Sequence, residues 1–130
     1  METHYREDSL RQALEHLHQR LPDVRGSVIV DNAGLLVTAY PQADEADSPT
    51  GGDQVAAMAS VLMGLAGRTL DRLAQGEVGR MLIEAENGIL VVVPATSEAA
   101  LAVLIGKQAK IGLAMHAIRR CAQEIRDILR

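Results

Sequence analysis

The run Ile89–Pro94, ILVVVP, constrains the fold of this chain most, because five aliphatic side chains follow one another without a polar residue. Successive side chains of a strand point to opposite faces, so this strand would present apolar groups on both faces of its sheet. A strand of this kind must be covered on both sides. We therefore expect a sheet with further layers packed on each face.

A hairpin is predicted immediately before this strand. Asn87-Gly88 is the dipeptide typical of a two-residue turn between antiparallel strands, and such a turn would pair Glu86 with Ile89. The preceding stretch, Val78–Glu86, carries three charged side chains among its apolar ones. Charges of this kind are typical of a strand at the edge of a sheet.

A second hairpin is predicted earlier in the chain. Two β-branched and aliphatic runs, 27–30 and 35–40, flank Asp31-Asn32-Ala33-Gly34. Asp in the first position and Gly in the last are typical of a type I turn followed by a residue able to take positive φ. A calcium loop starting at Asp31 would need oxygen ligands where Ala33 and Leu35 stand. The sequence therefore favours a turn over an ion site.

The remaining apolar patterns predict helices around these strands. Leucines spaced by four, three and four residues indicate an amphipathic first helix that Pro22 ends: Leu10, Leu14, Leu17 and Leu21. Leu101–Ile105 predicts a fifth strand, and an apolar stripe over 111–129 predicts a closing helix. With a second helix between the hairpins, the order is α-β-β-α-β-β-β-α, an α/β chain of the α+β sandwich type.

The second helix is predicted over 54–75, with Asp53 as its N-cap or first-turn acid. Helical spacing gathers one apolar face for the sheet: Val55, Met58, Ala59, Leu62, Ala66, Leu70 and Leu73. The opposite face holds Ala57, Ser60, Gly64, Arg68 and Asp71, with Val61 and Leu65 on one flank and Met63 and Gly67 on the other. Two glycines inside a helix each cost about 1 kcal/mol relative to alanine, whereas a helix facing water favours Glu, Lys and Gln.

Such small residues let another backbone come close. The neighbour is either another segment of the same chain or a second subunit. The first and last helices are both needed on the other face of the sheet, to cover 89–94. A second subunit is therefore the favoured neighbour, and an edge strand beside an uncovered helix suits an isologous dimer.

The segment between the first hairpin and the second helix is predicted to be a connector and not a phosphate site. The sequence PQADEADSPTGG, residues 41–52, is acidic and rich in Pro and Gly, which predicts an exposed connector. A phosphate cradle at TGGDQ is disfavoured, because no Gly-Lys-Ser or Gly-Lys-Thr follows and Asp53 stands where an anion would bind.

Composition limits the classes of function. The length of 130 residues suits a single domain covering 1–130. The chain has no Phe or Trp, and its 13 basic residues are scattered among 17 acidic ones, so both the stacking platforms and the basic patch of a nucleic-acid-binding protein are missing.

The sequence also gives an expectation for where the protein lies in the cell. A single cysteine, no signal-peptide pattern, and a longest charge-free stretch (54–67) too short to cross a bilayer make a cytoplasmic protein without a membrane span the expectation.

No arranged catalytic group or metal site is predicted, and no cofactor is expected. His16 and His18 point about 200° apart on a helix and are expected at the surface. His116 and Cys121 also diverge, and Cys121 lies in the apolar stripe of the last helix, which predicts a buried, inert thiol.

Several segments in this order and spacing resemble the Roadblock family of dynein light-chain-like domains, whose bacterial members include MglB-type regulators of Ras-like GTPases. The segments are VRGSVIVDNAGLLV, DQVAAMASVLMGLAGRTLDRL, GRMLIEAENGILVVVPA and ALAVLIGKQAKIGLAMHAIRRCAQEI. Within them stand the G-x-x-x-x-D-x-x-G-L pattern over 26–35 and the Ile-Gly-Leu of 111–113. The similarity runs from about Leu10 to Leu129.

The resemblance implies a five-stranded antiparallel sheet with the first and last helices on one face and the second helix on the other. It also implies a homodimer joined through the second helix and the third strand, on which a small GTPase can sit. Carried over by position, the dimer contacts would be Val61, Gly64, Leu65, Arg80, Leu82 and Glu84. The partner contacts would be Ala57, Ser60, Arg68, Asp71 and Arg72.

The leading hypothesis is therefore a non-enzymatic homodimeric regulator or scaffold that binds a Ras-like GTPase and could stimulate GTP hydrolysis by arranging the GTPase's own groups. Arg68 and Arg72 are candidate arginine fingers, but structural or docking roles are expected for them. The alternative is a small-ligand sensor of similar build, which would need a sizeable cavity with convergent polar groups.

Overall fold

The computed structural model describes residues 2–41 and 53–130, so the predicted connector and the disfavoured phosphate cradle lie outside the described residues. The elements are α1 (Glu2–Arg20), β1 (Val24–Asp31), β2 (Leu36–Tyr40), α2 (Asp53–Arg72), β3 (Met81–Glu84), β4 (Gly88–Pro94), β5 (Ala99–Gly106) and α3 (Ile111–Leu129). Among the described helices, none combines the length and the apolar character needed to span a membrane.

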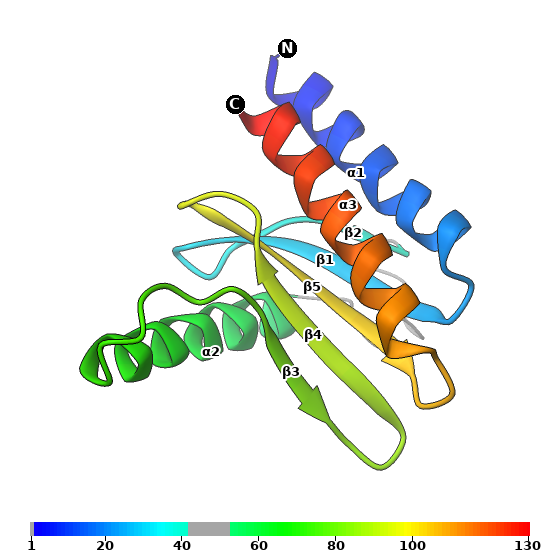
Figure 1. Cartoon of the computed structure of the whole chain (residues 1–130). Helices are drawn as coiled ribbons and strands as arrows, with labels where there is room; N and C mark the ends of the chain where they lie inside the picture. The colour runs from blue at the N-terminus through cyan, green and yellow to red at the C-terminus, as the bar shows by residue number, and fades with distance from the viewer. Residues whose placement is uncertain (1, 42–52) are drawn as a thin grey trace.

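The five strands form one sheet in the order β2-β1-β5-β4-β3, and every neighbouring pair is antiparallel. Helices α1 and α3 lie side by side on one face, and α2 lies on the other (Figure 1). Strand β3 is at an edge of the sheet, as its charges predicted. The expected α+β sandwich and its element order are confirmed.

The central strands divide the core into two parts of different character. On the α1–α3 face, long aliphatic side chains such as Leu14, Leu101 and Ile118 pack in one large cluster. On the α2 face the cluster is smaller and consists largely of alanine and valine, including Ala59, Ala102 and Val92. The layer beneath α2 is therefore thin, and the helix backbone can lie close to the sheet.

The turn between β1 and β2 forms as predicted. The Asp31 carboxylate oxygen Oδ1 accepts hydrogen bonds from the backbone N–H groups of Ala33 and Leu35, both at 2.9 Å. Gly34 has φ of 86°, a left-handed conformation that glycine adopts without strain. A Cβ atom at Gly34 would lie 3.6 Å from the Cα atom of Ala57, so this turn also supports α2.

The predicted register of the second hairpin is wrong. Ile89 pairs with Glu84 instead of Glu86, and β3 begins at Met81, so the chain turns over residues 85–88. Gly88 belongs to β4 and pairs with Gly106 of β5. A Cβ atom at Gly88 would lie 2.9 Å from the carbonyl oxygen of Ile105. This glycine therefore serves a close approach of two strands, whereas the sequence interpretation assigned it to a tight turn.

The side chain of Arg25 contacts two other segments at this end of the sheet. Its Nη1 atom donates a hydrogen bond to the carbonyl oxygen of Asn87 at 2.9 Å. Its guanidinium atoms lie 3.6 Å from the Cβ positions of both Gly88 and Gly106. Arg25 thus spans β1, β5 and the turn before β4.

The predicted sheet-facing side of α2 is wrong in two positions. The side chains of Met58 and Leu73 are 58% and 62% exposed, whereas Ala56 and Ala59 are buried against the sheet. Met63, which was expected on the outward side, also packs with Val55 against the cluster on the sheet. Because most side chains in this layer are small, Ala56 and Ala59 fit against the sheet and Met58 points outward. Helix α2 also ends at Arg72, and the left-handed residues Ala74 and Gly76 follow it.

His18 is half-buried, which corrects the expectation that it lies at the surface. Its Nε2 atom lies 3.0 Å from the hydroxyl oxygen of the buried Ser27, and its ring meets the ring of Tyr40 edge to face. Burial lowers the pKa of His18 below its ordinary value of 6.5. His16 instead contacts the Glu124 carboxylate at 2.9 Å.

We expect Gly88→Ala to reduce the free energy of unfolding by about 1 to 3 kcal/mol, because the added methyl group would collide with the backbone of β5. Urea denaturation measures the change. Gly79→Ala is the matched control, since nothing lies within 4 Å of its Cβ position and its φ is not positive. Equal stability of Gly88→Ala and the wild type would contradict the close approach.

Stability should also fall as the pH drops below about 6.5. In this range the unfolded chain takes up a proton at His18, whereas the folded chain, whose His18 pKa is lowered, does not. The loss stops once the pH passes the lowered pKa of the folded state. We expect His18→Gln to flatten this part of the profile, as measured by thermal unfolding between about pH 7.5 and 5.5.

Candidate protein-binding surface

The outward side of α2 carries exposed aliphatic side chains. Met58, Val61 and Leu65 are 58%, 66% and 53% exposed, and their spacing of three and four residues places them on one side of the helix. We call these three residues the α2 apolar flank. Isolated apolar residues are common on protein surfaces, whereas a contiguous stripe marks a surface that another molecule covers.

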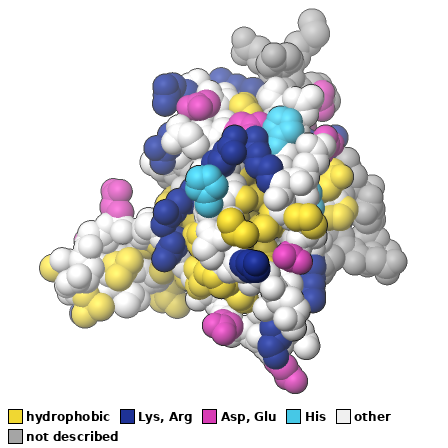
Figure 2. All heavy atoms as spheres, turned by 45° about the vertical axis from the view of Figure 1, so that its right-hand side comes forward, with side chains coloured by type: hydrophobic (Ala, Val, Ile, Leu, Met, Phe, Trp, Pro, Cys, Tyr) yellow, Lys and Arg dark blue, Asp and Glu magenta, His cyan; other side chains and the backbone are white. Residues whose placement is uncertain are grey.

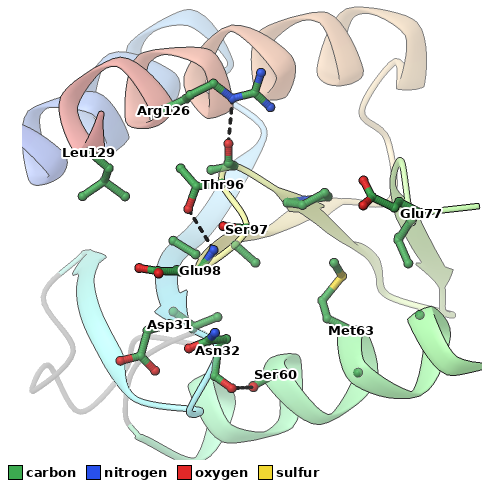
Figure 3. Close-up of a pocket in the computed structure, with 18 of the residues that line it drawn as sticks. Asp31, Asn32, Ser60, Met63, Glu77, Thr96, Ser97, Glu98, Arg126 and Leu129 are labelled. Atoms are coloured by element: carbon green, nitrogen blue, oxygen red, sulfur yellow. Dashed lines mark hydrogen bonds between the residues drawn. The ribbon is translucent and has the colours of Figure 1, made fainter.

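The other side of α2 borders a wide groove. Ser60, Gly64, Arg68 and Asp71 line it from the helix. Asn32 of the β1–β2 turn lies beside Ser60, and Thr96, Ser97 and Glu98 of the turn between β4 and β5 line the same groove (Figure 3). The groove has a volume of about 1590 Å³ and opens to solvent. Its walls carry charges of both signs, including Arg126 and Glu98.

Several polar groups of the groove are bonded within the chain. The Arg126 Nε atom donates to the carbonyl oxygen of Ala95 at 2.8 Å, and the Thr96 hydroxyl oxygen accepts a hydrogen bond from the Glu98 N–H at 3.1 Å (Figure 3). A small-molecule site encloses most of its ligand among a few convergent polar groups. An open groove with groups bonded in this way lacks that geometry, so it does not favour the ligand-sensor alternative.

The edge strand β3 adds a second exposed apolar surface. Leu82 and Ile83 are 41% and 39% exposed. Ile83 pairs with Leu90, which belongs to the α2-side cluster, so Ile83 points to the α2 face of the sheet. One edge of β3 has no neighbouring strand among the described residues. An uncovered strand of this kind can pair with another chain.

The structure brings some of the predicted contact residues together and separates others. Val61 and Leu65 share the α2 apolar flank, whereas Gly64 lies on the groove side. Leu82 and Glu84 pair with Val91 and Ile89, so they point to the α1–α3 face, away from α2. Arg80, just before β3, is exposed.

The predicted partner contacts also occupy different surroundings. The Ser60 hydroxyl donates to the carbonyl oxygen of Asn32 at 3.5 Å, and the Cα atom of Ala57 lies against the β1–β2 turn. Arg68, Asp71 and Arg72 are exposed on the last turns of α2. Their role as a partner-binding group stays a prediction.

Met58 and Ile83 are surface residues that the sequence interpretation did not select. Met58 was assigned to the core because its spacing fits an apolar stripe, and spacing alone does not tell which of two apolar sides meets the sheet. Ile83 stands in the continuous apolar run Met81–Ile83. Only the register with β4 shows which of these side chains share a face with α2.

The groups considered for catalysis lie apart from this surface. Cys121 is buried and its thiol donates to the carbonyl oxygen of Ala13 at 3.5 Å, as expected for an inert thiol. Burial raises its pKa to about 12, with the nearby Glu124 carboxylate adding to the effect. Across residues 2–41 and 53–130, no three His, Cys, Asp or Glu side chains are grouped to hold a metal ion.

Solved structures include several of similar fold. The Roadblock/LC7 domain from Streptomyces avermitilis is 28% identical, with a TM-score of 0.78 over 88% of this chain and 92% of that chain. Myxococcus xanthus MglB is 16% identical and has a TM-score of 0.83 over 95% of this chain and 89% of that one. The gliding protein MglB from Thermus thermophilus is 17% identical, with a TM-score of 0.82 over 95% and 90%.

The sequence itself matches a known family model. No curated protein sequence matches this chain. The model of the Roadblock/LC7 domain, however, matches residues 11–105, from the middle of α1 to the end of β5. Together with the observed sheet order and the placement of the three helices, this match shows that the chain belongs to the Roadblock/LC7 domain family.

Proposed function

We propose that this chain forms a homodimer through α2 and β3, and that the dimer binds a Ras-like small GTPase as a regulator or scaffold. The observation that carries the proposal is the outward-facing α2 apolar flank, together with the edge strand β3, which has no neighbouring strand on one side among the described residues. Membership of the Roadblock/LC7 family adds support, since the family's bacterial members resembled by the sequence are MglB-type regulators. A cytoplasmic location belongs to the same proposal.

The exposed apolar surfaces suit a second copy of the chain. A twofold axis beside β3 would let two copies of this strand pair antiparallel, and each copy would contribute its exposed Ile83 to the α2 face. The outward Met58, Val61 and Leu65 could then be covered by the partner's helix. Among the similar solved structures, one is described as MglB with a tetrameric arrangement, so self-association occurs in that protein.

The GTPase would meet charged groups on α2. Arg68, Asp71 and Arg72 are exposed on its last two turns, and the aliphatic flank lies about one to four turns before them. Arginine at the centre of a protein interface commonly contributes more than 1 kcal/mol to binding. The proposal gives this chain no chemical step of its own. A regulator of this kind acts by positioning the catalytic groups of its partner.

The dimer interface can be tested at Leu65. We expect Leu65→Lys to dissociate the dimer, because the apolar side chain would be replaced by a charge that must be desolvated. Leu113→Lys is the matched control, since Leu113 is 63% exposed on α3 in the opposite layer. Sedimentation at several concentrations measures the assembly state. A monomeric wild type, or a Leu65→Lys variant that assembles as the wild type does, would refute the interface.

Gly64→Leu gives a second test of the same interface. A Cβ atom at Gly64 would meet only the end of the Arg68 side chain at 3.7 Å, so the larger residue fits the isolated chain. It should raise helix stability by up to about 1 kcal/mol in the monomer. If another helix crosses there, the dimer should weaken while the helix content measured by circular dichroism stays the same. An unchanged dimer with a raised melting temperature would mean that Gly64 faces water.

GTPase binding is tested by mixing the chain with small GTPases encoded in the same genome. We expect one of them to bind the wild type, and Arg68→Ala with Arg72→Ala to weaken binding about tenfold or more. Single-turnover GTP hydrolysis separates the two roles, since a faster rate indicates a regulator and an unchanged rate with retained binding indicates a scaffold. Absence of binding to every such GTPase by a correctly assembled dimer would refute the proposal.

A further inference from the structure

The distribution of charge along the chain is uneven near its C-terminal end. No Asp or Glu occurs between Glu98 and Glu124, although the whole chain has a net charge of −4. The same stretch contains Lys107, Lys110, Arg119 and Arg120. A stretch with basic and no acidic side chains therefore runs through this part of an acidic protein.

These basic residues lie in and just after the turn that joins β5 to α3. Lys107 and Lys110 are exposed in that turn, and Arg119 and Arg120 are exposed two to three helical turns later. Between them, Leu113 is 63% exposed and shares the solvent side of α3 with Arg120, seven residues on. We call Lys107, Lys110, Leu113, Arg119 and Arg120 the α3 basic face. On the side of the molecule that carries α3, Lys and Arg side chains form a band beside exposed apolar groups (Figure 2).

Two nearby carboxylates, Glu124 and Asp127, line a depression together with Arg120, but each also contacts other basic groups. Glu124 is bonded to His16 and lies 3.9 Å from Arg20, and Asp127 lies 3.5 Å from Arg130. Asp23, whose carbonyl oxygen accepts a hydrogen bond from the Gly106 N–H, is the exposed acid next to the turn before α3. The α3 basic face therefore keeps an excess of positive charge.

We propose that the α3 basic face binds the surface of an anionic lipid bilayer. Lys and Arg side chains at an acidic bilayer are attracted by its surface potential, and an aliphatic side chain between them can enter the boundary between headgroups and acyl chains. Leu113 occupies that position among the basic residues. Binding would be peripheral and salt-dependent.

Other anionic partners fit this face less well. An exposed aliphatic side chain at the centre of a basic patch does not contribute to binding of the nucleic-acid backbone. The chain also has no Phe or Trp on which bases could stack. An acidic peptide or helix needs a groove for its anchoring side chains. The depression beside Arg20 and Arg120 has a volume of about 260 Å³, which is too small for a helix. A bilayer surface needs no shape complementarity.

The α3 basic face lies on the layer opposite α2 (Figure 1). A chain held on a bilayer through α3 would leave the α2 apolar flank pointing away from the lipid. The inference does not require the proposed dimer or the GTPase, and the two can fail independently.

The test is flotation of the full chain with lipid vesicles of phosphatidylcholine alone and of equal parts phosphatidylcholine and phosphatidylglycerol. At about 50 mM salt we expect binding to the anionic vesicles only, and loss of binding at about 0.5 M salt. Lys107→Gln with Lys110→Gln should weaken binding roughly thirtyfold, and Leu113→Ser roughly tenfold.

The matched control is Arg6→Gln with Arg130→Gln. It removes the same two positive charges at the opposite end of the α1–α3 layer, where both termini lie (Figure 1), and both residues are exposed. It should bind nearly as the wild type does. Three results would overturn the inference: equal binding to neutral vesicles, an equal loss in the control, or no vesicle binding by the wild type. Tighter binding to duplex DNA that also depends on Lys107 and Lys110 would reassign the face to nucleic acid.

Discussion

The two-sided apolar character of β4 and β5 is the constraint on which the rest of the structure depends. Side chains of these strands enter a core on each face of the sheet, so water must be excluded from both. Three helices share this task unequally. Two of them close the α1–α3 face with long aliphatic side chains, whereas α2 alone closes the other and lies mainly over β1 and β2. The β3 side of that face is left partly exposed, and this is where the candidate protein-binding surface begins.

The small side chains beneath α2 explain the chemistry of its outer surface. Because Ala56 and Ala59 face a layer of alanine and valine, the larger Met58, Val61 and Leu65 point outward. The packing of α2 on the sheet and the exposure of the α2 apolar flank therefore have the same cause, which is the small side chains beneath the helix. The glycines at 64 and 67 contribute little to the monomer, where nothing near them needs their small size.

Much of the fold followed from local patterns in the sequence. The leucine spacing of α1, the Asp31 turn and the aliphatic run of β4 each predict an element correctly, because each depends on residues close together in the chain. The register of the β3–β4 hairpin could not be predicted in this way, since Gly88 is required by its contact with β5 and not by the turn. The rotation of α2 and the side to which Ile83 points likewise depend on distant partners. For the same reason, sequence reasoning selected Val61 and Leu65 of the α2 apolar flank but missed Met58 and Ile83.

The contact between Arg25 and the β3–β4 turn links parts of the molecule that are far apart in the sequence. One guanidinium group holds the backbone of Asn87 and lies across Gly88 and Gly106. Gly106 in turn donates its N–H to Asp23, just before β1, and is followed by the turn that leads into α3. The β3–β4 hairpin is consequently connected to the rest of the sheet at its turn as well as along β4. The backbone of the turn is tied through one side chain to β1, and the residue before β1 is bonded to the end of β5, from which the chain enters α3.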